Sequence, residues 1–232
     1  NDFYLFNAKS NYKNDKINLT FGSSYSDYTG DHFGEIIWAR FASNSEIADN
    51  YYNGQGKKKD FSLFAKTTFR LNEKVSLFGD LQSRIVNYKT TGFTSDRINM
   101  LIDQTYNFFN PKAGITYKMN SKNNFYFSYA RANREPSRRD FESNPDITPE
   151  ELNDFEIGRR HNTKRFRIKA NMYYMCYNEQ QVLAGASDNT GAPIRPTIGD
   201  SYGVGLEIVS AVNMSKTLDI QPHLNESPKK TK

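Results

Sequence analysis

Length, composition and charge exclude several classes of protein before any element is predicted. The 232 residues include 31 lysines and arginines and 26 aspartates and glutamates, a net charge of +5, and the basic residues are spread along the chain, so no nucleic-acid-binding patch is indicated. A mean hydropathy of −0.78 leaves no run of about 20 apolar residues that could form a transmembrane helix. Cys176 is the only cysteine, which excludes an intrachain disulfide and a multi-cysteine zinc site.

Apolar and polar residues alternate in one segment after another, which is the period of a β-strand with one apolar face. In chain order the clearest segments are residues 16–25, 61–71, 75–85 and 166–176. In the last of these the apolar set is Phe166, Ile168, Ala170, Met172, Tyr174 and Cys176, which opposes Arg167, Lys169, Asn171 and Tyr173. We expect about ten such strands. Because a strand of this kind crosses a membrane with only about 10 residues, low hydropathy does not exclude a membrane β-barrel.

Short polar turns and long connections alternate between the predicted strands. The short turns fall at residues 14–15, 72–73, 120–123, 162–164 and 215–216, and the long connections at residues 29–58, 89–108, 133–151 and 181–200. This alternation predicts an antiparallel meander with tight turns at one end and loops at the other, which is typical of an outer-membrane barrel.

A soluble β-sandwich would show the same alternation, since its sheets also bury one face. Residues 74–88 and 165–180 form longer predicted strands than the roughly 5 to 6 residues usual in soluble proteins. The pattern therefore favours a membrane barrel, with a soluble antiparallel β domain as the alternative.

Several runs, taken in order, resemble a known family. The chain resembles the barrel portion of TonB-dependent outer-membrane receptors at residues 110–117, 125–131 (Phe-Tyr-Phe-Ser-Tyr-Ala-Arg), 134–141, 149–158, 171–177 and 201–207. Residues 32–40 and 80–84 are similar to receptors of this family in Bacteroides-like bacteria. Each run alone is a weak signal, and it is their order across residues 30–210 that is specific.

The resemblance implies an all-β fold, an antiparallel transmembrane β-barrel of about 22 strands with short periplasmic turns, long extracellular loops and a separate plug in its lumen. Residues 1–225 would then be a partial β-barrel of about ten strands, residues 226–232 a polar tail, and the plug domain would be absent. An open wall of this kind leaves two unpaired edges that lipid cannot satisfy. We therefore expect a fragment of a longer receptor.

The resemblance also implies active transport across the outer membrane of a Gram-negative bacterium. The intact receptor would bind a scarce solute, namely a siderophore-type iron chelate, haem or cobalamin, and import it with energy from TonB. Its expected partners are TonB, the plug domain, outer-membrane lipid, lipopolysaccharide and the small-molecule ligand, with no nucleic acid and no cofactor. No Gly-x-Ser-x-Gly elbow occurs, so an enzyme is not expected. A passive porin or an adhesion barrel is the alternative function.

Arginines and aromatic residues in the long connections are the candidate ligand-binding residues. Arg134, Arg138 and Arg139 could clamp an anionic chelate or the phosphates of lipopolysaccharide. The alternative is a solvated loop of internal ion pairs. Trp38 could stack on a flat ligand, together with Tyr51 and Tyr52, or these rings could belong to the outer aromatic girdle.

Charged residues on the polar faces of the strands should line the lumen. Only those nearest the outside could touch a ligand, namely Arg84, Tyr88 and Gln82. The three histidines, at positions 32, 161 and 223, are predicted in a loop, beside a turn and in the last strand, so no shared metal site is expected. Cys176 has the apolar parity of its strand, which predicts an inert thiol that faces lipid or is buried.

Overall fold

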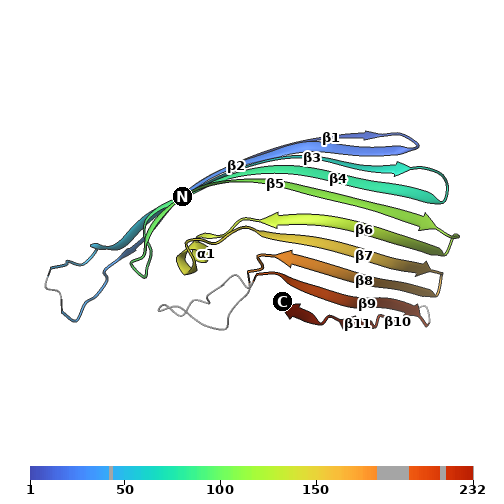
Figure 1. Cartoon of the computed structure of the whole chain (residues 1–232). Coiled ribbons are helices and arrows are strands. Elements are labelled where there is room, and N and C mark those ends of the chain that lie inside the picture. Colours follow the sequence, from blue (N-terminus) through green and yellow to red (C-terminus); the bar gives the residue numbers. More distant parts are fainter. Residues whose placement is uncertain (42–43, 182–198, 215–217, 232) are drawn as a thin grey trace.

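A single antiparallel sheet dominates the computed structural model, which describes residues 1–41, 44–181, 199–214 and 218–231 (Figure 1). Nine long strands pair in chain order: β1 (Asp2–Lys13), β2 (Ile17–Glu35), β3 (Asn50–Arg70), β4 (Val75–Phe93), β5 (Asn99–Lys118), β6 (Asn123–Arg134), β7 (Glu150–Asn162), β8 (Phe166–Asn178) and β9 (Ser201–Asn213). One short helix, α1 (Arg138–Ser143), lies between β6 and β7. The predicted all-β antiparallel fold is confirmed.

Three short strands pair with the edge of β9 that β8 does not occupy, and together they make a segmented tenth strand. They are β10 (Asp219–Ile220), β11 (His223–Glu226) and β12 (Lys229–Thr231). The breaks between them hold Pro222 and Pro228, which have no N–H to donate to a ladder. Their carbonyl oxygens still accept hydrogen bonds from the backbone N–H groups of Ser210 and Val204, at 3.0 and 3.4 Å. The segment predicted as a polar tail from residue 226 thus includes a strand.

The predicted short turns lie together at one end of the sheet, and the longer connections lie at the other (Figure 1). Three of the turns are closed by an asparagine, namely Asn14, Asn72 and Asn120. In each, the side-chain oxygen accepts hydrogen bonds from the backbone N–H groups two and three residues later, at 2.7 to 3.0 Å. Thr163 closes the fourth turn through its hydroxyl, and the predicted turn at 215–216 lies outside the described residues.

Two of the predicted long connections are mostly strand, so their predicted bounds were wrong. β2 runs to Glu35 and β3 starts at Asn50, and β4 and β5 are joined by residues 94–98 alone. His32, Tyr51 and Tyr52 therefore lie in strands rather than in a loop. Apolar alternation fades here because the outward face becomes mainly polar, with Lys57, Lys89 and Asp103, whereas the backbone pairing continues without it. The predicted connection at 133–151 is confirmed by the bounds of β6 and β7.

One face of the sheet carries continuous apolar rows. The register aligns one such row across eight adjacent strands, through Ile17, Phe69, Leu77, Ile115, Phe127, Ile157, Met172 and Leu206. These side chains have no second layer against them among the described residues, and Ile157 and Phe127 keep 57% and 46% of their surfaces exposed. A soluble sandwich would bury such rows against a second sheet. The single exposed layer instead fits hydrocarbon, as the sequence predicted.

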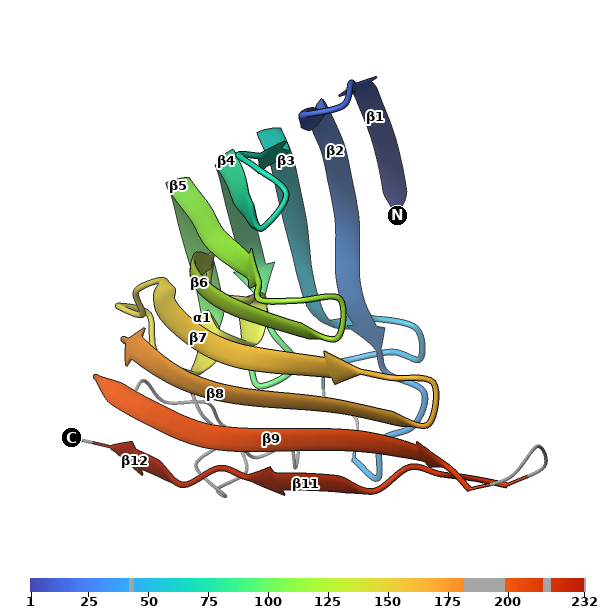
Figure 2. The same ribbon diagram turned by 90° about the vertical axis from the view of Figure 1, so that its right-hand side faces the viewer.

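The opposite face is polar and is the one that the β6–β7 connection covers. A typical row there joins Thr20, Lys66, Asp80 and Lys112 on four neighbouring strands. The sheet is curved, and its two edges, β1 and the β10–β12 segments, are not paired with each other (Figure 2). Among the described residues, no helix is long and apolar enough to cross a membrane.

Substitution of Phe127 by Arg should cost the full-length barrel about 2 to 4 kcal/mol of folding free energy, because it places a charge among the apolar rows. Ser128, the next residue of β6, belongs to the polar face, so Ser128→Arg is the matched control and should cost much less. Denaturant titration in lipid vesicles measures both. Equal costs would contradict the assignment of the two faces.

Candidate functional site

The β6–β7 connection folds back onto the polar face at the end of the sheet away from the short turns. Ser137 caps α1, since its backbone N–H donates to Asp140 Oδ2 at 2.8 Å while the Asp140 N–H contacts the Ser137 hydroxyl at 3.4 Å. Phe141, only 3% exposed, stacks on Tyr88 of β4 with ring centroids 5.9 Å apart. The buried cluster is completed by Met100 and Ile147, with Ile102 and Tyr106 beside it. Apolar packing therefore fixes this connection on β4 and β5.

An ion network holds the start of the same connection. Arg84 of β4 binds two carboxylates: its Nε and Nη2 donate to Asp60 of β3 at 2.5 to 3.1 Å, and its Nη1 and Nη2 donate to Glu135 at 2.7 and 2.9 Å. Lys58 Nζ donates to Glu135 Oε1 at 2.5 Å. The Arg84 guanidinium also lies 6.0 Å from the centre of the Phe108 ring. Glu135 thus joins the connection to two strands of the wall.

Glu135 is the acid on which the contact between the β6–β7 connection and strands β3 and β4 depends. Its side chain is 10% exposed, and burial alone would raise its pKa. The hydrogen bonds from Arg84 and Lys58 outweigh burial and hold the pKa at about 2, so the carboxylate stays charged at every physiological pH. Two cations fixed on one carboxylate form a strong, directional contact.

A pocket of about 320 Å³ lies beside the network, between β2–β4 and the start of the connection. Its wall includes the side chains of Tyr28, His32, Lys58, Tyr88, Glu135 and Arg138. Arg138 Nε donates to Glu142 at 3.2 Å, while its buried Nη1 has no hydrogen-bond partner among the described atoms. Phenol rings beside cationic donors suit a ligand that carries aromatic and anionic groups.

Gly54 makes room for Arg138. A Cβ on Gly54 would lie 3.2 Å from Arg138 Nη2 and 2.8 Å from the backbone oxygen of Thr91. Any larger residue there would push against both the Thr91 backbone oxygen and the Arg138 guanidinium. The position of that guanidinium therefore depends on this glycine.

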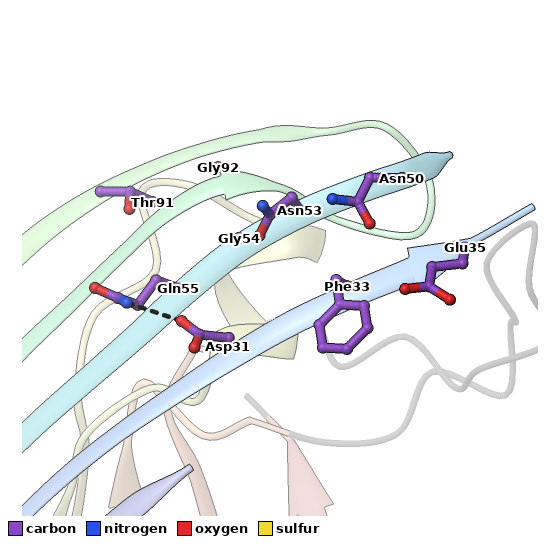
Figure 3. A pocket seen from close by; sticks show the side chains of 9 residues that line it. All are labelled: Asp31, Phe33, Glu35, Asn50, Asn53, Gly54, Gln55, Thr91 and Gly92. Carbon is purple, nitrogen blue, oxygen red and sulfur yellow. Dashed lines mark hydrogen bonds between the residues drawn. The ribbon is translucent and has the colours of Figure 1, made fainter. Parts of the chain in front are cut away.

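A second, shallower groove lies at the outer ends of β2, β3 and β4 (Figure 3). It is lined by acids, amides, one hydroxyl and one aromatic ring, namely Asp31, Glu35, Asn50, Asn53, Gln55, Thr91 and Phe33. Gln55 Nε2 donates to Asp31 Oδ1 at 2.8 Å. Asp31, Phe33, Asn53 and Gln55 have the strand parity of the apolar rows, so this groove lies on the opposite face from the Arg138 pocket.

The three candidate arginines do not form one clamp. Arg134 contacts Glu150 at 3.4 Å and donates to Gln181 at 2.8 Å, which is the ion-pair alternative considered above. Arg138 lines the pocket, whereas Arg139 is exposed and has no side-chain partner in the described part of the chain.

The remaining candidates are also separated. Arg84 is held in the ion network, and Tyr88 lies under Phe141 while it lines the pocket. Trp38 is 74% exposed in the connection between β2 and β3. Tyr51 packs edge-on against Tyr52 and lies beneath Arg97.

Sequence reasoning missed Tyr28, Lys58 and Glu135, and gave His32 no part in a pocket. Lys58 and His32 were hidden because residues 29–58 were predicted as a loop, so neither residue was assigned to a face of the sheet. A signal was nevertheless present: Lys58, Asp60 and Arg84 share the polar parity once the pairing of β3 and β4 is known. Glu135 could not be placed because its contacts depend on how the connection folds.

Substitution of Glu135 by Gln should loosen the connection, because Arg84 and Lys58 lose a charged acceptor worth about 1.5 to 3 kcal/mol. Amide hydrogen exchange of residues 137–147 should then accelerate by roughly 10- to 150-fold, at about 1.4 kcal/mol per factor of ten. Asp103→Asn removes an exposed ion pair with Lys89 and should leave exchange unchanged. A normal exchange pattern in Glu135→Gln would show that apolar packing alone holds the connection.

Acid should release the connection in the wild type. The folded pKa of Glu135, about 2, lies below its ordinary value of 4.5, so its stabilising contribution is complete above pH 4.5 and declines as the pH falls toward 2. Pepsin cleavage near Phe141 measures the release. The wild type should resist cleavage at pH 4.5 better than Glu135→Gln does, and the two should converge near pH 2. A constant ratio across this range would contradict the role of the carboxylate.

Known proteins share this architecture. The family described as TonB dependent receptor-like, beta-barrel matches residues 1–220, and no curated protein sequence matches the chain. The copper transporter OprC superposes with a TM-score of 0.81 at 12% identity, over 99% of this chain and 38% of its own. The ferric-catecholate import receptor Fiu from E. coli K12, in its closed form, gives 0.66 at 16% identity over the same shares.

The ferripyoverdine receptor of the Pseudomonas aeruginosa outer membrane, bound to ferripyoverdine, gives a TM-score of 0.69 at 15% identity, over 99% of this chain and 32% of its own. The chain thus spans well under half the length of these structures, and identities this low show the fold alone. Because the family match extends over residues 1–220, nearly the whole of the wall, this chain belongs to the TonB-dependent receptor β-barrel family.

Proposed function

We propose that this chain is part of the wall of an outer-membrane transporter that binds a scarce solute at its outer mouth and imports it with energy coupled through TonB. Family membership supports transport and an outer-membrane location, because the members compared above are receptors and transporters. The partners of such an importer would be TonB and a plug domain in the lumen, which the polar rows of the sheet would face.

The observation that carries the proposal is the pocket beside the β6–β7 connection. It lies on the polar face, at the end of the strands opposite the short turns, where an external solute would arrive first. Its walls are held in place by the Arg84 network and by Phe141, so they are ordered before a ligand binds. Preorganised donors lose less conformational entropy on binding, which favours high affinity for a dilute solute.

The chemistry of the pocket favours an anionic iron chelate with aromatic donor groups as the solute. Arg138 and His32 supply cationic or hydrogen-bonding groups, and Tyr28 and Tyr88 supply flat surfaces. Fiu is named as a ferric-catecholate import receptor, and a catecholate chelate has both of these properties. Of the three arginines predicted from the sequence, Arg138 is the one proposed to contact the ligand.

Substitution of Arg138 by Gln in the full-length receptor should weaken binding of a ferric catecholate by about tenfold, the loss of one charge-assisted contact of about 1.4 kcal/mol. Arg139→Gln removes the same charge from the neighbouring exposed position and should change affinity less than twofold. Fluorescence quenching titrations of the purified receptor measure both. Equal affinities of the two variants would remove Arg138 and the pocket from the proposal.

Energy coupling has its own test. Cells that carry the receptor should accumulate the radiolabelled ferric chelate only when TonB is present, although surface binding should persist without it. Accumulation that continues in cells lacking TonB would indicate a passive porin instead. This outcome would leave the binding result for Arg138 untouched, so binding and coupling are judged separately.

A further inference from the structure

Two glycines of β3 leave space on the polar face for the His32 ring and the Arg138 guanidinium. A Cβ on Gly56 would lie 3.5 Å from His32 Nε2. A Cβ on Gly54 would lie 3.2 Å from Arg138 Nη2. The two glycines are two residues apart on one face of the strand, a separation of about 7 Å. Gly30, the residue paired with Gly56, also has no side chain to rise between the two groups. One small ligand can therefore contact the imidazole and the guanidinium together.

The fixed charges around His32 balance each other. On the polar face they form two ion pairs, Lys58 with Glu135 and Arg138 with Glu142. One charge of each sign flanks the pocket from the opposite face, on Lys57 and Asp31, and one of each sign lies behind Glu135, on Arg84 and Asp60. The remaining titratable groups of the wall are the phenols of Tyr28 and Tyr88, which are uncharged at neutral pH. An anionic ligand therefore enters a pocket that has no surplus of fixed positive charge.

His32 is the group of this wall whose charge can change near neutral pH. In the free protein, burial and the neighbouring Arg138 hold the pKa of His32 below its ordinary value of 6.5, and Asp31 and Glu142 oppose them only in part. The ring is therefore mainly neutral at pH 7. A negative charge placed beside the ring would favour its protonated form and raise the pKa again.

We propose that His32 takes up a proton when the pocket binds an anionic ligand, so that the imidazolium and the Arg138 guanidinium hold the ligand together. The proton comes from solvent and adds to the free ring nitrogen, and no bond of the ligand is made or broken. Because His32 lies in the solute pocket, its role rests on the proposed function. The proton supplies the positive charge that the balanced ion pairs do not.

This coupling sets the direction of the pH dependence. The proton is present in the complex and absent from the free pocket, so affinity rises as the pH falls from the raised pKa of the complex to the lowered pKa of the free protein. One proton for each ligand limits the rise to about tenfold per pH unit. We expect roughly a threefold to tenfold gain in affinity between about pH 7.5 and about pH 6.

Isothermal titration calorimetry of the full-length receptor, with the ferric complex of a tris-catecholate as the probe, measures the proton directly. Titrations at about pH 6.5 are run in two buffers that differ in their enthalpy of ionisation, and the wild type should show a heat difference equivalent to about half a proton per ligand. His32→Gln should bind the chelate with that uptake removed. His161→Gln changes a histidine at the short-turn end of β7 and should keep the wild-type uptake. Protonation of the chelate itself is common to all three proteins, so the difference between them reports His32.

The outcomes separate this role of His32 from the proposed function. Binding by the wild type with equal heats in the two buffers would overturn the proton uptake while leaving the pocket as a ligand site, and this comparison needs no variant. Equal proton uptake by the wild type and His32→Gln would also overturn it. A wild type that does not bind the chelate in either buffer would remove the proposed solute class, and the role of His32 with it.

Discussion

Hydrocarbon offers no water to an unpaired backbone N–H or C=O, and this constraint governs the rest of the structure. The chain satisfies it with long antiparallel strands, of which β2 to β9 have their ladder hydrogen bonds met by neighbours on both sides. The outward residues are then left to contact lipid, and the register brings them into rows such as that from Ile17 to Leu206. The same pairing leaves the inward residues free of any packing requirement, so they can be polar. In a wall built in this way, alternate residues of one strand have different roles: one set faces lipid and the other set faces the lumen.

The constraint ends where the strands leave the hydrocarbon, and the site begins there. Above the Tyr25–Phe61–Ile85 row the outward face becomes mainly polar, and the strands continue because backbone pairing still satisfies them. Their inner face then serves as a platform for the β6–β7 connection. Phe141 supplies the apolar contact and Glu135 the ionic one, so the connection is held against β3, β4 and β5. The pocket exists because this loop is fixed.

The features predictable from the sequence are those that depend on local chemistry and on the hydrocarbon. Alternation placed β8, and the asparagine turns at 14, 72 and 120 were visible because one side chain closes each turn. The extensions of β2 and β3 were not predictable, since Asp27 and Lys57–Lys59 interrupt the alternation without interrupting the pairing. The ion network of Arg84 and Glu135 could not be predicted from the sequence for a second reason. Arg84 and Glu135 are 51 residues apart, and nothing in either neighbourhood encodes the fold of the connection between β6 and β7.

Register joins the two faces of the wall into one unit. Lys57 and Lys58 are neighbours in β3, but the first projects outward opposite Lys89 and the second projects inward to Glu135. A slip of one residue between β3 and β4 would exchange these roles, because side chains alternate strictly along a strand. It would bring Lys58 to the lipid side, withdraw it from Glu135 and turn Phe61 into the lumen. The short turn closed by Asn72 sets the pairing of these two strands. A single side chain at the far end of the hairpin thus helps to keep the pocket and the lipid-facing surface in register with each other.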